Sequence, residues 1–163
     1  MPRQAYVRVD MKFRVMTAVA GALCAVLVSP AVEAQAAPSL AQRALSVAAA
    51  QKGDPYKWGA TGPDRFDCSG LTYYSYRKSG KTLPRTAQAQ YNKSRHVAPS
   101  KRRVGDLVFI GRSSRGIYHV GIYAGWKDGA GWFWDAPKPG RTVGKHKIRD
   151  YTAGSPRAYY GRF

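Results

Sequence analysis

The chain has 163 residues, a length that favours one domain and leaves little room for a second sizeable one. Its 27 basic and 9 acidic residues give a formal net charge of +18, which excludes an acidic surface and draws the protein toward polyanions. Hydrophobic residues make up 44% of the sequence, which has no internal repeat or low-complexity tract, so one packed core is expected.

Residues 1–36 have the pattern of a secretory signal peptide. Four basic residues open this segment, and Val15–Val28 is an apolar run of 14 residues. That run is shorter than the roughly 20 residues that cross a bilayer as a helix, and the small residues Ala34 and Ala36 suit signal cleavage. We predict that residues 37–163 form the exported domain, with no membrane span after processing. An N-terminal anchor that stays attached is the alternative.

Three helices are predicted in the first half of the exported domain. Leu40–Lys52 carries apolar residues at helical spacing, and Ser39 can cap its start. Residues 56–67 are rich in glycine and proline, which predicts a loop. Cys68–Ser79 and Thr86–Asn92 are expected to form the second and third helices.

From residue 104 onward the pattern changes to short apolar runs separated by glycine-rich turns, which is typical of antiparallel strands. The predicted strands are Asp106–Gly111, His119–Gly125, Trp132–Asp135, Lys145–Tyr151 and Ala158–Phe163. Helices followed by strands indicate an α+β domain in which N-terminal helices pack on an antiparallel sheet.

One cysteine, Cys68, remains after residue 36. Exported proteins usually pair their cysteines, so a lone thiol needs another reason to be present. Cys68 lies where the predicted loop meets a helix, and the free N–H groups and dipole of a helix N-terminus favour a thiolate and can bind an oxyanion. A small structural cysteine at a helix start is the alternative.

His119 opens a predicted strand whose apolar face is supplied by Val120 and Ile122, so its imidazole is available as a proton acceptor. Asp135 ends the next strand, and a hairpin with its turn at 125–131 would bring it beside His119, where it can orient the ring. His119 as a surface histidine and Asp135 as a turn residue are the alternatives. His96 and His146 are weaker candidates, because His96 lies in a basic loop and His146 lies between two lysines.

Six segments resemble the NlpC/P60 domain in order and spacing. They are Tyr56–Gly59, Phe66–Leu71, Leu83–Ala87, Gly105–Phe109, His119–Tyr123 and Asp135–Pro137. The resemblance covers about residues 40–163. It implies a circularly permuted papain-like fold and a cysteine peptidase that hydrolyses peptidoglycan stem peptides at the bond between the γ-carboxyl of D-glutamate and a diamino acid.

The resemblance also implies roles for individual residues. Cys68 matches the family nucleophile and His119 its base, while Asp135 stands where the family often has a histidine. Tyr56, Ser69 and Arg85 match positions near the substrate or the oxyanion. The chemistry needs neither a metal nor another cofactor, and the sequence has no cluster with metal-ligand spacing.

The expected partners follow from export and from charge. Beyond residue 36 the net charge is +16, because 23 basic residues face seven aspartates. The resemblance implies peptidoglycan peptides as substrate; the charge suits anionic cell-wall polymers, and no nucleic-acid partner is expected for a secreted, monomeric wall protein. A merely solvated basic surface is the alternative. A non-catalytic wall-binding protein remains a rival function, as does an amidase, transpeptidase or acyltransferase with the same Cys–His chemistry.

Overall fold

The computed structural model describes residues 37–163, so the predicted signal peptide lies outside the described residues. Three α-helices come first in this part of the chain. They are α1 (Leu40–Ala50), α2 (Cys68–Lys78) and α3 (Ala87–Lys93). Each begins where a side chain accepts a hydrogen bond from a backbone N–H of the first turn: Ser39 for α1, Asp67 for α2 and Thr86 for α3.

A six-stranded antiparallel sheet with the order β1-β6-β2-β3-β4-β5 follows the helices. Its strands are β1 (Arg95–Val97), β2 (Leu107–Gly111), β3 (Ile117–Lys127), β4 (Ala130–Asp135), β5 (Gly144–Lys147) and β6 (Arg157–Arg162). Two short 3-10 helices, η1 (Pro99–Lys101) and η2 (Ile148–Tyr151), lie between strands. The prediction of an α+β domain with helices packed on an antiparallel sheet is therefore confirmed.

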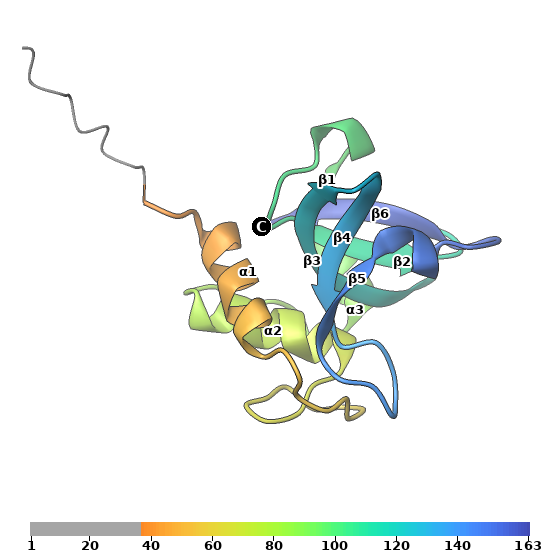
Figure 1. The fold of residues 1–163 in the computed structure, drawn as a ribbon. Coiled ribbons are helices and arrows are strands. Elements are labelled where there is room, and N and C mark those ends of the chain that lie inside the picture. Colours follow the sequence, from red (N-terminus) through yellow and green to blue (C-terminus); the bar gives the residue numbers. More distant parts are fainter. Residues whose placement is uncertain (1–36) are drawn as a thin grey trace, which may run out of the picture. The chain divides into compact units, whose positions relative to one another are not determined.

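Helices cover one face of this sheet, as Figure 1 shows for α1 and α2 beside β3 and β4. The larger apolar cluster lies between the helices and the sheet and includes Leu71, Phe109 and Val120. A smaller cluster on the other face includes Phe133 and Ile148, the first residue of η2. Because β2 and β3 are buried on both faces, their sequences are almost continuously apolar rather than alternating.

The β3–β4 hairpin is longer and its turn is tighter than the sequence pattern predicts. The predicted turn at 125–131 is wrong: only Asp128 and Gly129 separate the two strands. Both residues have positive φ angles, 52° and 69°, as the two central residues of a type I′ turn require. An Asp-Gly pair is a strong sequence signal for this turn. β3 therefore continues to Lys127, and β4 begins at Ala130.

The predicted strand Lys145–Tyr151 is correct only in its first half. β5 ends at Lys147, and residues 148–151 form η2. β5 is an edge strand with a single partner, and the turn of η2 buries Ile148 in the smaller cluster. This turn also directs the Tyr151 hydroxyl back toward the end of β4, where it donates to Asp135.

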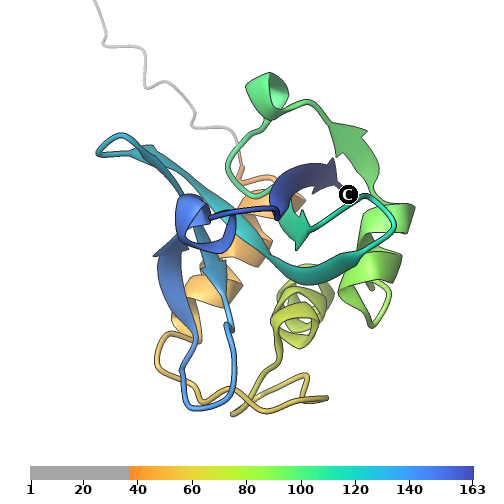
Figure 2. The same cartoon turned by 90° about the vertical axis from the view of Figure 1, so that its right-hand side faces the viewer.

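Two loops that are far apart in the sequence run side by side at one end of the domain, at the lower edge of Figure 2. Residues 51–67 connect α1 to α2, and residues 136–143 connect β4 to β5. Backbone hydrogen bonds join them: the Tyr56 N–H donates to the Arg141 carbonyl at 2.9 Å, and the Val143 N–H donates to the Asp54 carbonyl at 2.8 Å. Within residues 37–163, no helix has the length and apolar character needed to cross a membrane.

Candidate active site

Cys68 is the first residue of α2 and is half-buried. The carboxylate of Asp67, the N-cap, accepts a hydrogen bond from the Gly70 N–H at 2.7 Å. In the described part of the chain, the N–H groups of Cys68 and Ser69 donate to no other residue. Two backbone donors at the positive end of a helix dipole therefore remain available next to the thiol.

Arg85 holds the N-cap in place from the segment before α3. Its guanidinium donates to both oxygens of the Asp67 carboxylate and to the Ser69 hydroxyl, the latter at 2.9 Å. The Gly59 N–H and the Ser69 hydroxyl also donate to the same carboxylate, at 2.8 Å and 3.3 Å. The positive charge of Arg85 thus offsets the negative charge of Asp67 beside Cys68. The sequence placed Arg85 and Ser69 near the substrate; both line the cleft described below, and they also contact each other.

His119 and Asp135 lie side by side across the β3–β4 pair. The Nε2 atom of His119 is 2.7 Å from Oδ2 of Asp135, and both side chains are almost fully buried. Gly121 follows His119 by two residues on β3, and a Cβ there would lie 2.9 Å from the Asp135 Cβ and 2.5 Å from the Trp134 carbonyl oxygen. A glycine at this position lets the end of β4 approach closely enough for the carboxylate to reach the imidazole.

Two further side chains hold the same carboxylate, and sequence reasoning missed both. Nδ1 of His146 is 2.7 Å from Oδ1 of Asp135, and the Tyr151 hydroxyl donates to Oδ2 at 2.8 Å. The Tyr151 ring also stacks on the His119 ring, with centroids 5.0 Å apart. Three partners on one buried carboxylate define its position and satisfy its lone pairs.

The pKa of His119 reflects competing influences. Burial alone would lower this pKa, but the hydrogen bonds with Asp135 and Cys68, together with their charges, outweigh burial and raise the pKa to about 9. Because Nε2 of His119 faces Asp135, Nδ1 is the ring nitrogen that remains to exchange a proton with the thiol. Burial would also raise the pKa of Asp135, but hydrogen bonds from His119 and His146 lower it below its ordinary value. Asp135 is therefore an anion that favours the imidazolium form of His119.

Tyr56 lies close to the thiol from the loop that precedes α2. Burial and the nearby Cys68 and Asp67 charges raise the pKa of its phenol above the ordinary value. The hydroxyl is therefore protonated at neutral pH and available as a hydrogen-bond donor.

A cleft of about 430 Å³ opens over the start of α2. Cys68, Ser69 and Arg85 line it, and two exposed aromatic side chains, Trp58 and Tyr118, stand at its edges. Among residues 37–163, no group of three or more His, Cys, Asp and Glu side chains is arranged to hold a metal ion. The thiol of Cys68 therefore opens into this cleft, while the buried pair of His119 and Asp135 lies behind the thiol and does not line the cleft. Together the three side chains define a candidate Cys–His site.

Gly70 is required where the loop before α2 passes over the helix start. A Cβ at this position would lie 1.9 Å from the Ala60 carbonyl oxygen. We therefore expect Gly70→Ala to reduce the free energy of unfolding by about 2 kcal/mol or more and to displace the backbone beside Cys68. Urea unfolding measures the effect. Gly116→Ala is the matched control, because a Cβ there meets nothing closer than 3.4 Å; equal stability losses in the two variants would contradict this expectation.

Comparison with known proteins agrees with this geometry. The model of the NlpC/P60 family matches residues 53–155, so the chain belongs to the NlpC/P60 family. A protein of Corynebacterium glutamicum strain R named "probable endopeptidase" is 49% identical over 106 residues, which cover 64% of this chain and 49% of that protein. The chain therefore spans about half the length of this curated relative.

Two solved structures share the fold. The NlpC/p60 domain of the peptidoglycan hydrolase SagA has a TM-score of 0.65 and 30% identity, over 75% of this chain and 98% of that one. RipD of Mycobacterium tuberculosis, described as a non-catalytic NlpC/p60 domain protein adapted to peptidoglycan binding, has a TM-score of 0.62 and 27% identity, over 77% and 98% of the two chains. Relatives with this fold therefore include both a hydrolase and a non-catalytic protein.

Proposed function

We propose that this protein is an exported cysteine peptidase that hydrolyses peptidoglycan stem peptides, with Cys68 as nucleophile, His119 as acid and base, and Asp135 as the group that orients His119. The observation that carries the proposal is the His119 imidazole, held at 2.7 Å by the buried Asp135 carboxylate and close enough to Cys68, at the start of α2, for that thiol to help raise the pKa of His119. The names of the relatives support the same substrate class.

The proposed mechanism is acyl transfer through a thioester. The Cys68 thiolate attacks the amide carbon, and the N–H groups of Cys68 and Ser69 stabilise the oxyanion, with the Tyr56 hydroxyl as a third donor. The imidazolium of His119 gives its proton to the leaving amine as the C–N bond breaks. His119 then takes a proton from water, whose oxygen attacks the thioester carbon and releases a carboxylate and the thiol.

The bond proposed for cleavage joins the γ-carboxyl of D-glutamate to the diamino acid. Incubation of the protein with defined muropeptides, followed by mass spectrometry, tests this proposal. We expect two products that together contain one added water, one ending in D-glutamate and the other beginning with the free amine of the diamino acid. Release of the intact peptide from its sugar would instead identify an amidase, and a new amide bond without added water would identify a transpeptidase.

A non-catalytic wall-binding protein is the second candidate, because RipD combines this fold with that role. The two candidate functions predict different reactivities for the Cys68 thiol. A catalytic Cys68 beside an imidazolium reacts rapidly with an alkylating reagent, whereas an inert structural cysteine does not.

We propose that the positive net charge of the protein retains it on the anionic polymers of the cell wall. The net charge of +16 beyond residue 36 attracts anionic polymers over a range that salt shortens, with a Debye length of about 10 Å at 0.1 M and about 3 Å at 1 M. We expect the fraction that sediments with isolated cell walls to fall several-fold between 0.05 and 1 M NaCl. The Cys68→Ala variant serves in this assay, because it leaves the wall undigested. Sedimentation that is unchanged across this range would show that attraction by charge is not what retains the protein.

A further inference from the structure

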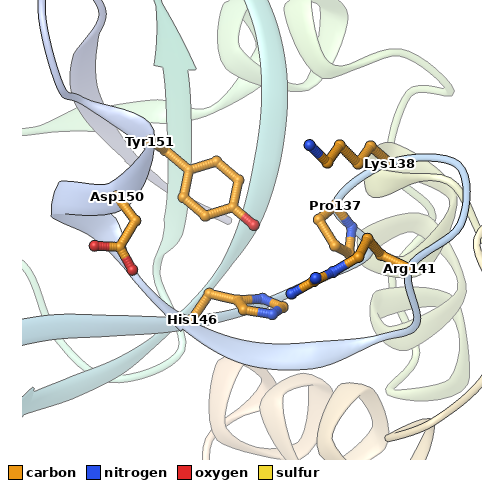
Figure 3. A pocket seen from close by; sticks show the side chains of 6 residues that line it. All are labelled: Pro137, Lys138, Arg141, His146, Asp150 and Tyr151. Atoms are coloured by element: carbon orange, nitrogen blue, oxygen red, sulfur yellow. The ribbon is translucent and has the colours of Figure 1, made fainter.

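A second pocket lies beside the Asp135 carboxylate and shares no lining residue with the cleft over Cys68. It has a volume of about 440 Å³ and is lined by Pro137, Lys138, Arg141, His146, Asp150 and Tyr151. Figure 3 shows Lys138 and Arg141 extending from the loop after β4 toward the Tyr151 and His146 side chains. The pocket is therefore formed by a basic loop on one side and by two of the residues that hold Asp135 on the other.

Positive charge is in excess in this second pocket. Lys138 and Arg141 are exposed, and within the described part of the chain neither side chain forms an ion pair or a side-chain hydrogen bond. Asp150 is the single acidic residue of the lining. Two cations without partners, directed into the same hollow with an imidazole and a phenol at its base, suit a negatively charged group with several oxygens.

A phosphate group of a polymer suits this arrangement of an arginine and a lysine. The planar fork of Arg141 can hold the two non-ester oxygens of a phosphodiester, and Lys138, from the same loop, can contact one of these oxygens as well. A single carboxylate can accept from the same donors, but a phosphodiester polymer also carries a negative charge on each neighbouring repeat, which the net charge of +16 beyond residue 36 attracts. The pocket is open at the surface, so a phosphate that belongs to a polymer can enter while the rest of the polymer passes outside.

We propose that this pocket binds a phosphate group of an anionic phosphodiester polymer. The cell-wall setting of that polymer rests on the proposed function, but the binding itself does not. A polymer held there lies against His146 and Tyr151, directly behind the pair of Asp135 and His119. The protein would then cut peptides only a short distance from the phosphodiester chain to which it is bound.

Titration followed by proton NMR of the His146 imidazole tests the proposal without any turnover. The probes are inorganic phosphate, a short oligomer of glycerol phosphate, and acetate. We expect saturable shifts of the His146 signals, with the oligomer binding at least tenfold more tightly than inorganic phosphate, and acetate binding more weakly than both. Equal binding of acetate and phosphate, or an oligomer that binds no better than inorganic phosphate, would overturn the proposal.

The variant Lys138→Ala/Arg141→Ala removes both cations from the pocket, and we expect its affinity for the oligomer to fall at least tenfold. Arg112→Ala/Lys127→Ala is the matched control, because it removes the same charge from exposed positions outside the pocket. We expect the control to bind within twofold of the parent. If both double variants lose affinity equally, the binding depends on overall charge and the pocket is not the site. Repeating the titration with Cys68→Ala separates this result from the peptidase proposal, since binding persists there whether or not Cys68 is catalytic.

Discussion

Replacing Cys68 with alanine is expected to abolish the hydrolysis of muropeptides while leaving the fold intact. The thiol supplies the attacking atom, and no other side chain in the described cleft can form the thioester. Removal of a nucleophile in comparable acyl-transfer enzymes costs on the order of 10⁶-fold in kcat. Cys68 is half-buried, and loss of one sulfur atom leaves the Asp67 cap of α2 in place.

Mass spectrometry of products from parent and Cys68→Ala, with circular dichroism to compare their folding, measures this effect. Ser46→Ala is a suitable control, because Ser46 lies on α1 and its hydroxyl bonds only to the Gln42 carbonyl of the same helix. We expect the control to retain full activity. A folded Cys68→Ala protein that still releases the same products would refute the assignment of the nucleophile.

Replacing Asp135 with asparagine is expected to lower kcat by on the order of 10²-fold or more and to change the pH dependence of the reaction. The carboxylate stabilises the imidazolium of His119, whose pKa it helps to raise to about 9. Without the negative charge the imidazolium loses its proton at a lower pH. The alkaline limb of kcat/KM, near pH 9 in the parent, should therefore move toward neutral pH in the variant.

Tyr151→Phe provides the matched comparison for Asp135→Asn. It removes one donor from the Asp135 carboxylate but keeps the charge, so His119 retains its anionic partner. We expect its alkaline limb to remain in place or to move slightly upward, because a carboxylate with fewer donors is a stronger base. If the limb stays near pH 9 in Asp135→Asn as well, a group other than His119 controls it.

Much of this site could be predicted from local sequence, because local rules determine its main parts. Cys68 follows Asp67, a preferred N-cap residue, so its place at a helix start can be inferred from the neighbouring residues alone. The pairing of His119 with Asp135 follows from two apolar strands joined as a hairpin. Even with the turn misjudged, the start of one strand and the end of the next are adjacent in such a pair.

Sequence reasoning misses the other two partners of Asp135, His146 and Tyr151, for different reasons. Lys145 and Lys147 flank His146 and make it a weak candidate in the sequence, yet in a strand the neighbours at ±1 point to the opposite face. Both lysines lie over the Trp132 ring, while His146 faces Asp135. That alternation was visible in the sequence. The contribution of Tyr151 was not, because it depends on η2 turning the chain back after the edge strand.

The role of Arg85 also needed the structure. The family resemblance implies a place near the substrate, which stays a prediction, whereas the contacts of its guanidinium with Asp67 and Ser69 appear only in the structure. These contacts join residues 16 to 18 positions apart in the sequence. The periodicity of a helix or a strand cannot predict a contact at that separation. The predicted circular permutation of a papain-like fold remains an expectation from the family resemblance.

The rate at which iodoacetamide modifies Cys68 at pH 7 tests the central pairing of thiol and imidazole most directly. Mass spectrometry of the peptide that contains Cys68 distinguishes this residue from Cys24, and the same protein unfolded in urea supplies the reference rate. We expect the folded protein to react at least tenfold faster than the unfolded chain and to lose this advantage in His119→Asn. A folded rate equal to or below the unfolded rate would show that His119 does not activate the thiol, and the proposed mechanism would be wrong.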